Sequence, residues 1–189
     1  MIFSKYGDLI CQGKSFSECN ITIEMYTQST IKLNIQSKEE KIFNALCLGI
    51  SDYFAKTGNK EAVLGVSGGI DSALTAAIAV NAIGSKNVHG VLMPSKFSSK
   101  HSIKDAIALA KNLEMDYEII PIQNSVDSII SSLSKSFNGK KVDKTEENIQ
   151  SRIRGNILMS LANKFNWLLL TTGNKTELAL GYCTIYGDI

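Results

Sequence analysis

From residue 62 onward, short apolar segments of strand length alternate with longer segments of helical periodicity. The pattern predicts strands at 62–66, 88–93, 117–122 and 167–171, and helices at 72–82, 102–113, 126–136 and 146–164. Strands that alternate with helices build a parallel sheet covered on both faces. We therefore expect an α/β fold whose ligands bind beyond the carboxyl ends of the strands.

Residues 1–36 have a different pattern. Short β-prone runs at 2–3, 9–10, 21–23 and 31–33 are separated by glycine and serine, which is too little material for an independent sheet domain. At Ser37 the pattern changes, because Ser37 and Glu40 have the spacing of a capping box and apolar residues then recur at helical spacing up to Phe54. We expect a boundary between residues 36 and 37.

Charge and cysteine content exclude several classes of protein. The 20 basic and 18 acidic residues leave a net charge of +2, too small to predict nucleic acid or a membrane surface as a partner. The four cysteines form no CxxC pair, so a zinc site is not expected and the thiols are expected to be reduced. Neither a secretory leader nor an apolar run of transmembrane length is evident. We expect a soluble, cytoplasmic protein.

The residues between the first strand of the alternating region and its helix carry the sharpest motif. They are Gly65, Val66, Ser67, Gly68, Gly69, Ile70, Asp71 and Ser72. Adjacent glycines let the backbone approach an anion, and the amides of the following helix N-terminus favour a phosphate. Asp71 would repel a polyphosphate unless a cation such as Mg²⁺ lay between them. The alternative is a glycine-rich turn with Asp71 as a helix cap.

Two familiar nucleotide loops do not fit this segment. A Walker A loop requires GxxxxGK[ST], and no lysine occupies that place, while the dinucleotide fingerprint GxGxxG is also missing. The remaining pattern, SGGxDS, resembles the pyrophosphate-binding loop of ATP pyrophosphatases, which split ATP into AMP and pyrophosphate. This resemblance implies an ATP site at the end of the first core strand.

Two further segments carry polar side chains at positions that favour binding. Asn148 and Arg152 are four residues apart on the long predicted helix and so share a face, although taken alone they are better explained as polar residues on a solvated helix face. Gly155 costs about 1 kcal/mol in a helix interior relative to alanine, which predicts that something packs closely there. After the last strand, Thr172 could contact a nucleotide and Glu177 could be a second Mg²⁺ ligand, or Glu177 could simply begin a helix.

The polar stretch 138–145 interrupts the alternating pattern. It is rich in lysine, asparagine and glycine, which predicts a mobile loop. Because it lies between two elements that carry motif residues, we interpret it as a possible lid over substrate.

Three segments together resemble the NAD⁺ synthetase family: GVSGGIDS (65–72), ENIQSRIRGN (147–156) and LLLTTGNKTELALGYCTIYGD (168–188). The last form resembles the glutamine-dependent branch. The resemblance covers residues 37–189 and implies a Rossmann-like fold of the adenine nucleotide alpha hydrolase type. By position, residues 1–36 resemble the last strands of the nitrilase-like glutaminase domain that precedes the synthetase in that branch.

The resemblance implies amidation of deamido-NAD⁺ through an acyl adenylate, with release of AMP and pyrophosphate. It implies that residues 65–72 and Thr172 bind ATP, and that Asp71 and Glu177 hold Mg²⁺. Asn148, Arg152 and Glu177 are the residues expected to contact deamido-NAD⁺. No side chain is assigned as a general acid, base or nucleophile, because positioning and charge neutralisation suffice for this chemistry.

This sequence departs from the family pattern in two ways. It stops soon after Gly187, whereas the family continues, so we expect a C-terminally incomplete synthetase domain. The glutaminase residues would precede Met1, so ammonia or a partner glutaminase is the expected nitrogen source, and the family implies a homodimer. Two alternatives remain: a truncated fragment that only binds ATP, and another pyrophosphatase-loop enzyme such as a GMP synthetase or a tRNA-modifying ligase.

Overall fold

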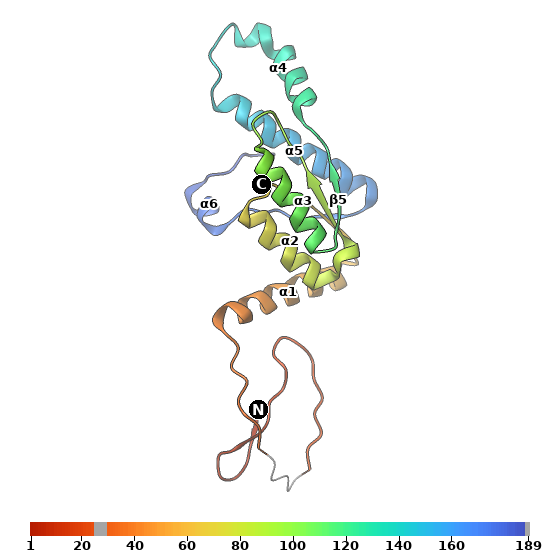
Figure 1. Ribbon diagram of the computed structural model, residues 1–189, viewed down its shortest axis with the longest axis vertical. Helices are drawn as coiled ribbons and strands as arrows, with labels where there is room; N and C mark the ends of the chain where they lie inside the picture. The colour runs from red at the N-terminus through yellow and green to blue at the C-terminus, as the bar shows by residue number, and fades with distance from the viewer. Residues whose placement is uncertain (25–29, 188–189) are drawn as a thin grey trace. The chain divides into compact units, whose positions relative to one another are not determined.

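The computed structural model describes residues 1–24 and 30–187 (Figure 1). Contacts within the chain divide it into two units, Met1–Ile50 and Ser51–Ile189. The division falls inside helix α1 (Lys38–Thr57), so this helix contributes to both units. The assignment of residues 1–36 to the end of a glutaminase domain stays a prediction.

The first unit contains a small antiparallel pair, β1 (Ile2–Phe3) and β2 (Leu9–Cys11). The segment near residue 34 lies beside it, because the side-chain amide of Gln12 exchanges two hydrogen bonds with the backbone of Asn34, at 3.0 and 2.9 Å. The strands expected at 21–23 and 31–33 do not form. Their apolar side chains are exposed, so neither run has the buried face that stabilises a strand.

Helix α1 begins as the sequence predicts. The Glu40 amide donates to the Ser37 hydroxyl at 3.0 Å, which supplies one half of the expected capping box. The Glu40 carboxylate instead accepts from the Gln36 side chain at 3.1 Å. Of the apolar residues at helical spacing on α1, Phe54 is buried, whereas Ile42 and Leu46 are about half exposed.

The second unit is built on a parallel sheet of four strands in the order β5-β4-β3-β6. The strands are β3 (Ala62–Gly65), β4 (Val88–Leu92), β5 (Asp116–Ile119) and β6 (Leu168–Leu169). The helices are α2 (Ile70–Ile83), α3 (Lys100–Asn112), α4 (Gln123–Phe137), α5 (Lys144–Phe165) and α6 (Lys175–Leu180), with a 3₁₀ turn η1 (Ser85–Asn87) before β4. The predicted α/β class is confirmed.

Helices cover both faces of this sheet (Figure 1). Leu64 packs with residues of α2 and α3, whereas its neighbour Val63 packs with residues of α4 and α5. Successive strand residues point to opposite faces, so β3 supplies both halves of the core. The strands are short, and β6 pairs with β3 over two residues only.

Three polar and aromatic side chains meet at the amino ends of the strands. Glu61, just before β3, accepts a hydrogen bond from the Trp167 indole at 3.1 Å and lies 2.7 Å from His89 Nε2. The rings of His89 and Trp167 are stacked, with centroids 3.8 Å apart and planes inclined by 10°. This cluster ties β3, β4 and the start of β6 together at the edge of the sheet opposite the carboxyl ends.

Helix α5 begins two residues earlier than the sequence pattern predicts, so the loop after α4 covers 138–143 only. The reason is Asp143, which caps α5 by accepting from the Thr145 amide at 2.7 Å, while the Glu146 side chain accepts from the Asp143 amide at 2.8 Å. These hydrogen bonds to Thr145 lower the pKa of Asp143 below its ordinary value.

The Asp143 cap predicts an acid-dependent contribution to stability. Because the pKa is lowered in the folded chain, the contribution is present at neutral pH and is lost as the pH falls from about 4 through the folded pKa. Asparagine caps helices about as well as aspartate, so Asp143→Asn should remove only this charge-dependent part. We expect the melting temperatures of the two proteins to differ most near pH 6 and to converge near pH 2 in thermal melts followed by circular dichroism. A difference that persists at low pH would contradict this assignment.

Candidate functional site

The glycine-rich loop lies at the carboxyl end of β3, where the sequence predicts it. Its polar groups form a closed ring: the Gly69 amide donates to Ser67 Oγ at 3.1 Å, Ser67 Oγ lies 3.1 Å from Ser72 Oγ, and Ser72 Oγ donates to the Gly69 carbonyl at 3.0 Å. The Ser67 amide also donates to Ser72 Oγ at 3.2 Å. Ser72 is buried, so the ring holds the loop in place from its buried side.

This ring separates the loop amides into two groups. The amides of Ser67 and Gly69 are used inside the loop, and the Val66 amide donates to the Val91 carbonyl of β4 at 2.9 Å. The amides of Gly68, Ile70, Asp71 and Ser72 donate to no acceptor among the residues that the structure describes. These amides, at the N-terminus of α2, are therefore the ones available for a phosphate. The hydroxyls of Ser67 and Ser72 are used in the ring.

Gly68 brings this loop against the start of α3. Its φ is +83°, a left-handed conformation that glycine adopts readily. A Cβ atom at this position would lie within 2.3 Å of the Ser102 carbonyl oxygen in the first turn of α3. Glycine is therefore required at position 68 for two reasons: the backbone conformation and the close approach of two chain segments.

Asp71 and Glu177 are brought together through Asn174, although 106 residues separate the two carboxylates in the sequence. The Asn174 side-chain amide donates to Asp71 Oδ2 at 3.4 Å. Asn174 also caps α6, because its Oδ1 accepts from the Glu177 amide at 2.9 Å while Glu177 Oε2 accepts from the Asn174 amide at 3.0 Å. Glu177 thus begins a helix, as one of its two sequence interpretations expects, and its capping partner Asn174 contacts Asp71. Its role as a Mg²⁺ ligand stays a prediction.

The pair of carboxylates fits a magnesium ion by its chemistry. Mg²⁺ is commonly held by one or two carboxylates together with substrate phosphates and water. Asp71 is exposed beside the amides at the N-terminus of α2, Glu177 is half-buried, and neither forms an ion pair with a described basic residue. No group of three or more metal-binding side chains occurs within residues 1–24 and 30–187, so any ion here would depend on ligands that the substrate supplies. Thr172, half-buried after β6, forms no side-chain hydrogen bond with the described residues.

Asn148 and Arg152 share a face of α5, as their spacing predicts, and both bond to the same segment of the chain. Asn148 Oδ1 accepts from the Thr184 hydroxyl at 3.2 Å, and Arg152 Nε donates to the Ile185 carbonyl at 3.2 Å. Gly155 lies on the same side, and a Cβ atom there would be 2.4 Å from the Gly187 carbonyl oxygen. The close packing expected at Gly155 is therefore present, and residues 184–187 supply it.

This contact predicts the effect of Gly155→Ala. Alanine favours a helix by about 1 kcal/mol over glycine, but its methyl group would collide with the Gly187 backbone. We expect 184–187 to move off α5, seen as faster hydrogen exchange of the Gly187 amide, which donates to the Thr184 carbonyl. The matched control is Gly49→Ala in α1, where a Cβ meets nothing within 4 Å and stability should rise by about 1 kcal/mol. Equal stabilisation by both substitutions would contradict the close contact.

Two elements near the site were missed by the sequence reasoning. Arg154 donates from Nε to the Met93 carbonyl at 3.2 Å, just after β4, and burial lowers the pKa of its guanidinium. The chain from Ser95 to Ser102 follows the same strand, and its Ser99 caps α3. The sequence did carry a signal for this second element, because serines and lysines follow a buried strand at its carboxyl end.

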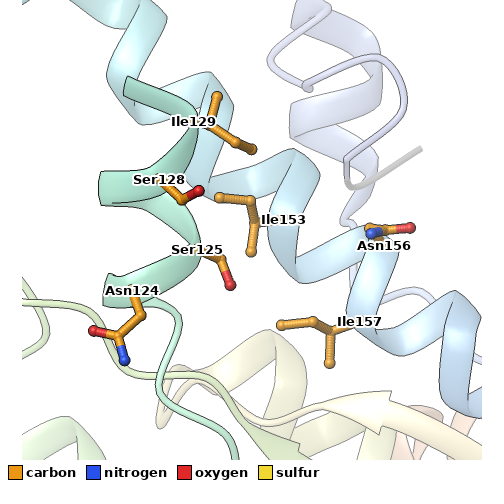
Figure 2. A pocket seen from close by; sticks show the side chains of 7 residues that line it. All are labelled: Asn124, Ser125, Ser128, Ile129, Ile153, Asn156 and Ile157. Atoms are coloured by element: carbon orange, nitrogen blue, oxygen red, sulfur yellow. The ribbon is translucent and has the colours of Figure 1, made fainter. Parts of the chain in front are cut away.

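A separate groove of about 430 Å³ lies between α4 and α5 (Figure 2). Ser125, Ser128 and Ile129 of α4 face Ile153 and Ile157 of α5 across it (Figure 2). None of its lining residues is titratable or belongs to the predicted site. The groove offers no charged group to a nucleotide, so we place the site at the carboxyl ends of β3 and β6.

Among the described residues no helix is long and apolar enough to cross a membrane.

Comparison with known proteins decides the family. The NAD synthase family model matches residues 42–189, which is most of the chain. The chain belongs to the NAD synthase family. This assignment rests on the segments that carry the loop, α5 and α6, and it agrees with the parallel sheet and helices described above.

Individual relatives support the same assignment. The chain is 55% identical over 152 residues to the glutamine-dependent NAD(+) synthetase of Thermotoga maritima, covering 80% of this chain and 26% of the relative. It is 46% identical over 201 residues to the protein of that name from Acinetobacter baylyi, covering 100% of this chain and 36% of the relative. A solved glutamine-dependent NAD+ synthetase from Acinetobacter baumannii, in complex with ADP, superimposes with a TM-score of 0.82 at 43% identity and covers 84% of this chain and 30% of that one. The chain thus spans about a quarter to a third of these relatives.

Proposed function

We propose that this chain supplies the ATP-dependent amidation step of NAD⁺ synthesis. The deamido-NAD⁺ carboxylate attacks the α-phosphorus of ATP, and pyrophosphate leaves with the electron pair of the broken P–O bond. Ammonia then attacks the acyl carbon of the adenylate, AMP leaves, and one proton is released from nitrogen. The observation that carries the proposal is the NAD synthase match over the segments whose polar groups converge at the carboxyl ends of β3 and β6.

The loop is assigned to the ATP phosphates. The amides of Gly68, Ile70, Asp71 and Ser72 are without acceptors in the described chain, and they lie at the N-terminus of α2, where the helix dipole favours an anion. Preorganised amides stabilise charge that develops on phosphate during transfer, because they need no reorganisation at the moment of reaction. Thr172 is assigned to the nucleotide on its position after β6.

Asp71 and Glu177 are assigned to Mg²⁺. Bound there, the ion would neutralise charge on the phosphates and orient them. The contribution of the chain itself is to hold the two carboxylates in place through the capping of α6 and the ring that fixes the loop before α2. Positioning of this kind accounts for large rate effects without a general base.

Asn148 and Arg152, with Glu177, are assigned to deamido-NAD⁺. Asn148 and Arg152 already bond to Thr184 and Ile185, so dinucleotide binding would have to include the 184–187 segment or displace it. This one observation favours a second candidate function, in which the chain binds ATP without turning over deamido-NAD⁺. The family match favours synthesis of NAD⁺ over the chemistry of other pyrophosphatase-loop ligases such as GMP synthetase.

The remaining assignments concern the setting of the reaction. We place the protein in the cytoplasm, as a homodimer, with ammonia supplied free or by a partner glutaminase. The loop at 138–143, three of whose residues are asparagine, glycine and aspartate, is assigned as a lid. Equal protease cleavage of this loop with and without ATP plus deamido-NAD⁺ would contradict the lid.

The deciding experiment measures NAD⁺, AMP and pyrophosphate together, from deamido-NAD⁺, Mg·ATP and ammonium. Formation of all three in equal amounts, abolished by EDTA and not supported by glutamine alone, is the expected result. ATP binding by the folded chain without NAD⁺ formation would replace the proposal with the second candidate. Repeating the assay with a separately expressed glutaminase domain and glutamine tests whether a partner supplies the ammonia.

A further inference from the structure

Asn174 lies between the two carboxylates of the proposed metal site and contacts both residues. Its Nδ2 donates to Asp71 Oδ2 at 3.4 Å, its Oδ1 accepts from the Glu177 amide at 2.9 Å, and its backbone amide donates to Glu177 Oε2 at 3.0 Å. A single side chain therefore joins the helix start that carries Glu177 to the loop that carries Asp71. We propose that Asn174 is a positioning residue that sets Asp71 and Glu177 for one divalent cation. This inference rests on the proposed function.

Capping of α6 does not by itself require asparagine. The cap uses the Oδ1 acceptor, which serine, threonine or aspartate supplies equally well or nearly so. The side-chain NH₂ group of Asn174 has no part in the cap and reaches Asp71 instead. Asparagine carries an acceptor for the helix and a donor for the carboxylate on two separate atoms, so one side chain serves both.

The Asn174 side chain that joins the two carboxylates is uncharged, so it does not compete with a cation. A lysine or arginine between the two carboxylates would form ion pairs and neutralise them, and so compete with a metal ion. The amide orients Asp71 through a hydrogen bond but leaves its negative charge in place. Each carboxylate also keeps a second oxygen, Asp71 Oδ1 and Glu177 Oε1, that accepts no hydrogen bond from the described residues.

The length of α6 explains why positioning is needed. The helix has six residues, fewer than a helix needs to be stable on its own in water. Glu177 is its third residue, so the location of this carboxylate depends on the reciprocal capping by Asn174. Partners that orient metal ligands typically change metal affinity by about 10- to 100-fold when they are removed.

Two substitutions separate the positioning role from the capping role. Asn174→Ser keeps a cap acceptor but is too short to reach Asp71, whereas Asn174→Ala removes both contacts. The measurement is the dissociation constant of the full chain for α,β-methylene-ATP by calorimetry, once with Mg²⁺ and once with EDTA. The ratio of the two constants reports the metal-dependent part of binding, and melting temperature reports the helix cap. Asn163→Ser, on an exposed position of α5, is the control for the same chemical change.

The expected result is that both Asn174 variants lose about tenfold of the Mg²⁺-dependent gain in affinity, while binding in EDTA changes less than about twofold. Only the alanine variant should melt at a lower temperature. A serine variant with the Mg²⁺ dependence of the unmodified chain would overturn the inference and leave Asn174 as a helix cap. An unmodified chain that binds the nucleotide equally with Mg²⁺ and EDTA would overturn the proposed metal site and the inference together.

Discussion

Asp71→Asn is expected to lower the rate of NAD⁺ formation by at least about 100-fold while leaving the melting temperature nearly unchanged. Asparagine has the shape of aspartate and can still accept the hydrogen bond from Asn174, so the substitution removes the charge and little else. Asp71 is exposed at the start of α2, where loss of one carboxylate costs at most a fraction of the helix-dipole interaction, about 0.3–1 kcal/mol. Activity and stability should therefore respond very differently.

The measurement is a Mg²⁺ titration of the rate in both proteins. Asp52→Asn is the matched control, because Asp52 is also an exposed helix carboxylate and pairs with Lys56 at 2.6 Å in α1. That pair is solvent-exposed and contributes little, so the control should retain both rate and melting temperature. A rate for Asp71→Asn within threefold of the control at all Mg²⁺ concentrations would remove Asp71 from the metal site.

Gly68→Ala is expected to be the most disruptive small substitution in the loop. A left-handed alanine costs about 1–2 kcal/mol, and its Cβ would meet the Ser102 backbone, which cannot move as a flexible side chain would. The loop or the start of α3 must therefore shift. A shift of about 1 Å in groups that position a substrate can cost on the order of 100-fold in rate, so nucleotide turnover should fall along with stability.

Gly58→Ala separates the two causes. Gly58 also has a positive φ, +75°, but a Cβ atom there would meet nothing within 4 Å. Urea unfolding of this control should show the conformational cost alone, about 1–2 kcal/mol, with no loss of turnover. If Gly68→Ala were no more destabilising than Gly58→Ala, the contact with Ser102 would be too loose to constrain the loop.

The alternating pattern of the sequence was sufficient to predict the sheet and its helices, because the buried faces of strands and helices repeat within short stretches of sequence. Val63 and Leu64 are both completely buried on opposite faces, which is why β3 appears in the sequence as an unbroken apolar run. The same reasoning gave a wrong prediction at 21–23 and 31–33, where the expected strands do not form. Those runs have β-prone residues, but a strand needs a paired neighbour and a buried face, and neither can be read from three residues.

The residues of the candidate site could be proposed from the sequence, but their arrangement could not. Spacing placed Asp71 and Glu177 at the carboxyl ends of strands, yet nothing in the sequence indicated that Asn174 would contact both. The hydrogen-bonded ring of Ser67 and Ser72 could not be predicted either, since a serine in such a motif can bond to a ligand or to the loop itself. Contacts between segments 33 to 103 residues apart, such as Arg152 with Ile185, depend on the fold as a whole.

The cluster of Glu61, His89 and Trp167 at the amino ends of the strands provides an intrinsic fluorescent probe. Trp167 is its single tryptophan, and its indole ring stacks on the imidazole of His89 and on Phe165. Tryptophan fluorescence therefore originates at one small region, at the end of the sheet away from the glycine-rich loop. Emission should follow the opening of β3, β4 and β6 during unfolding and stay constant while ligands bind, so folding and binding can be followed in one sample without a label.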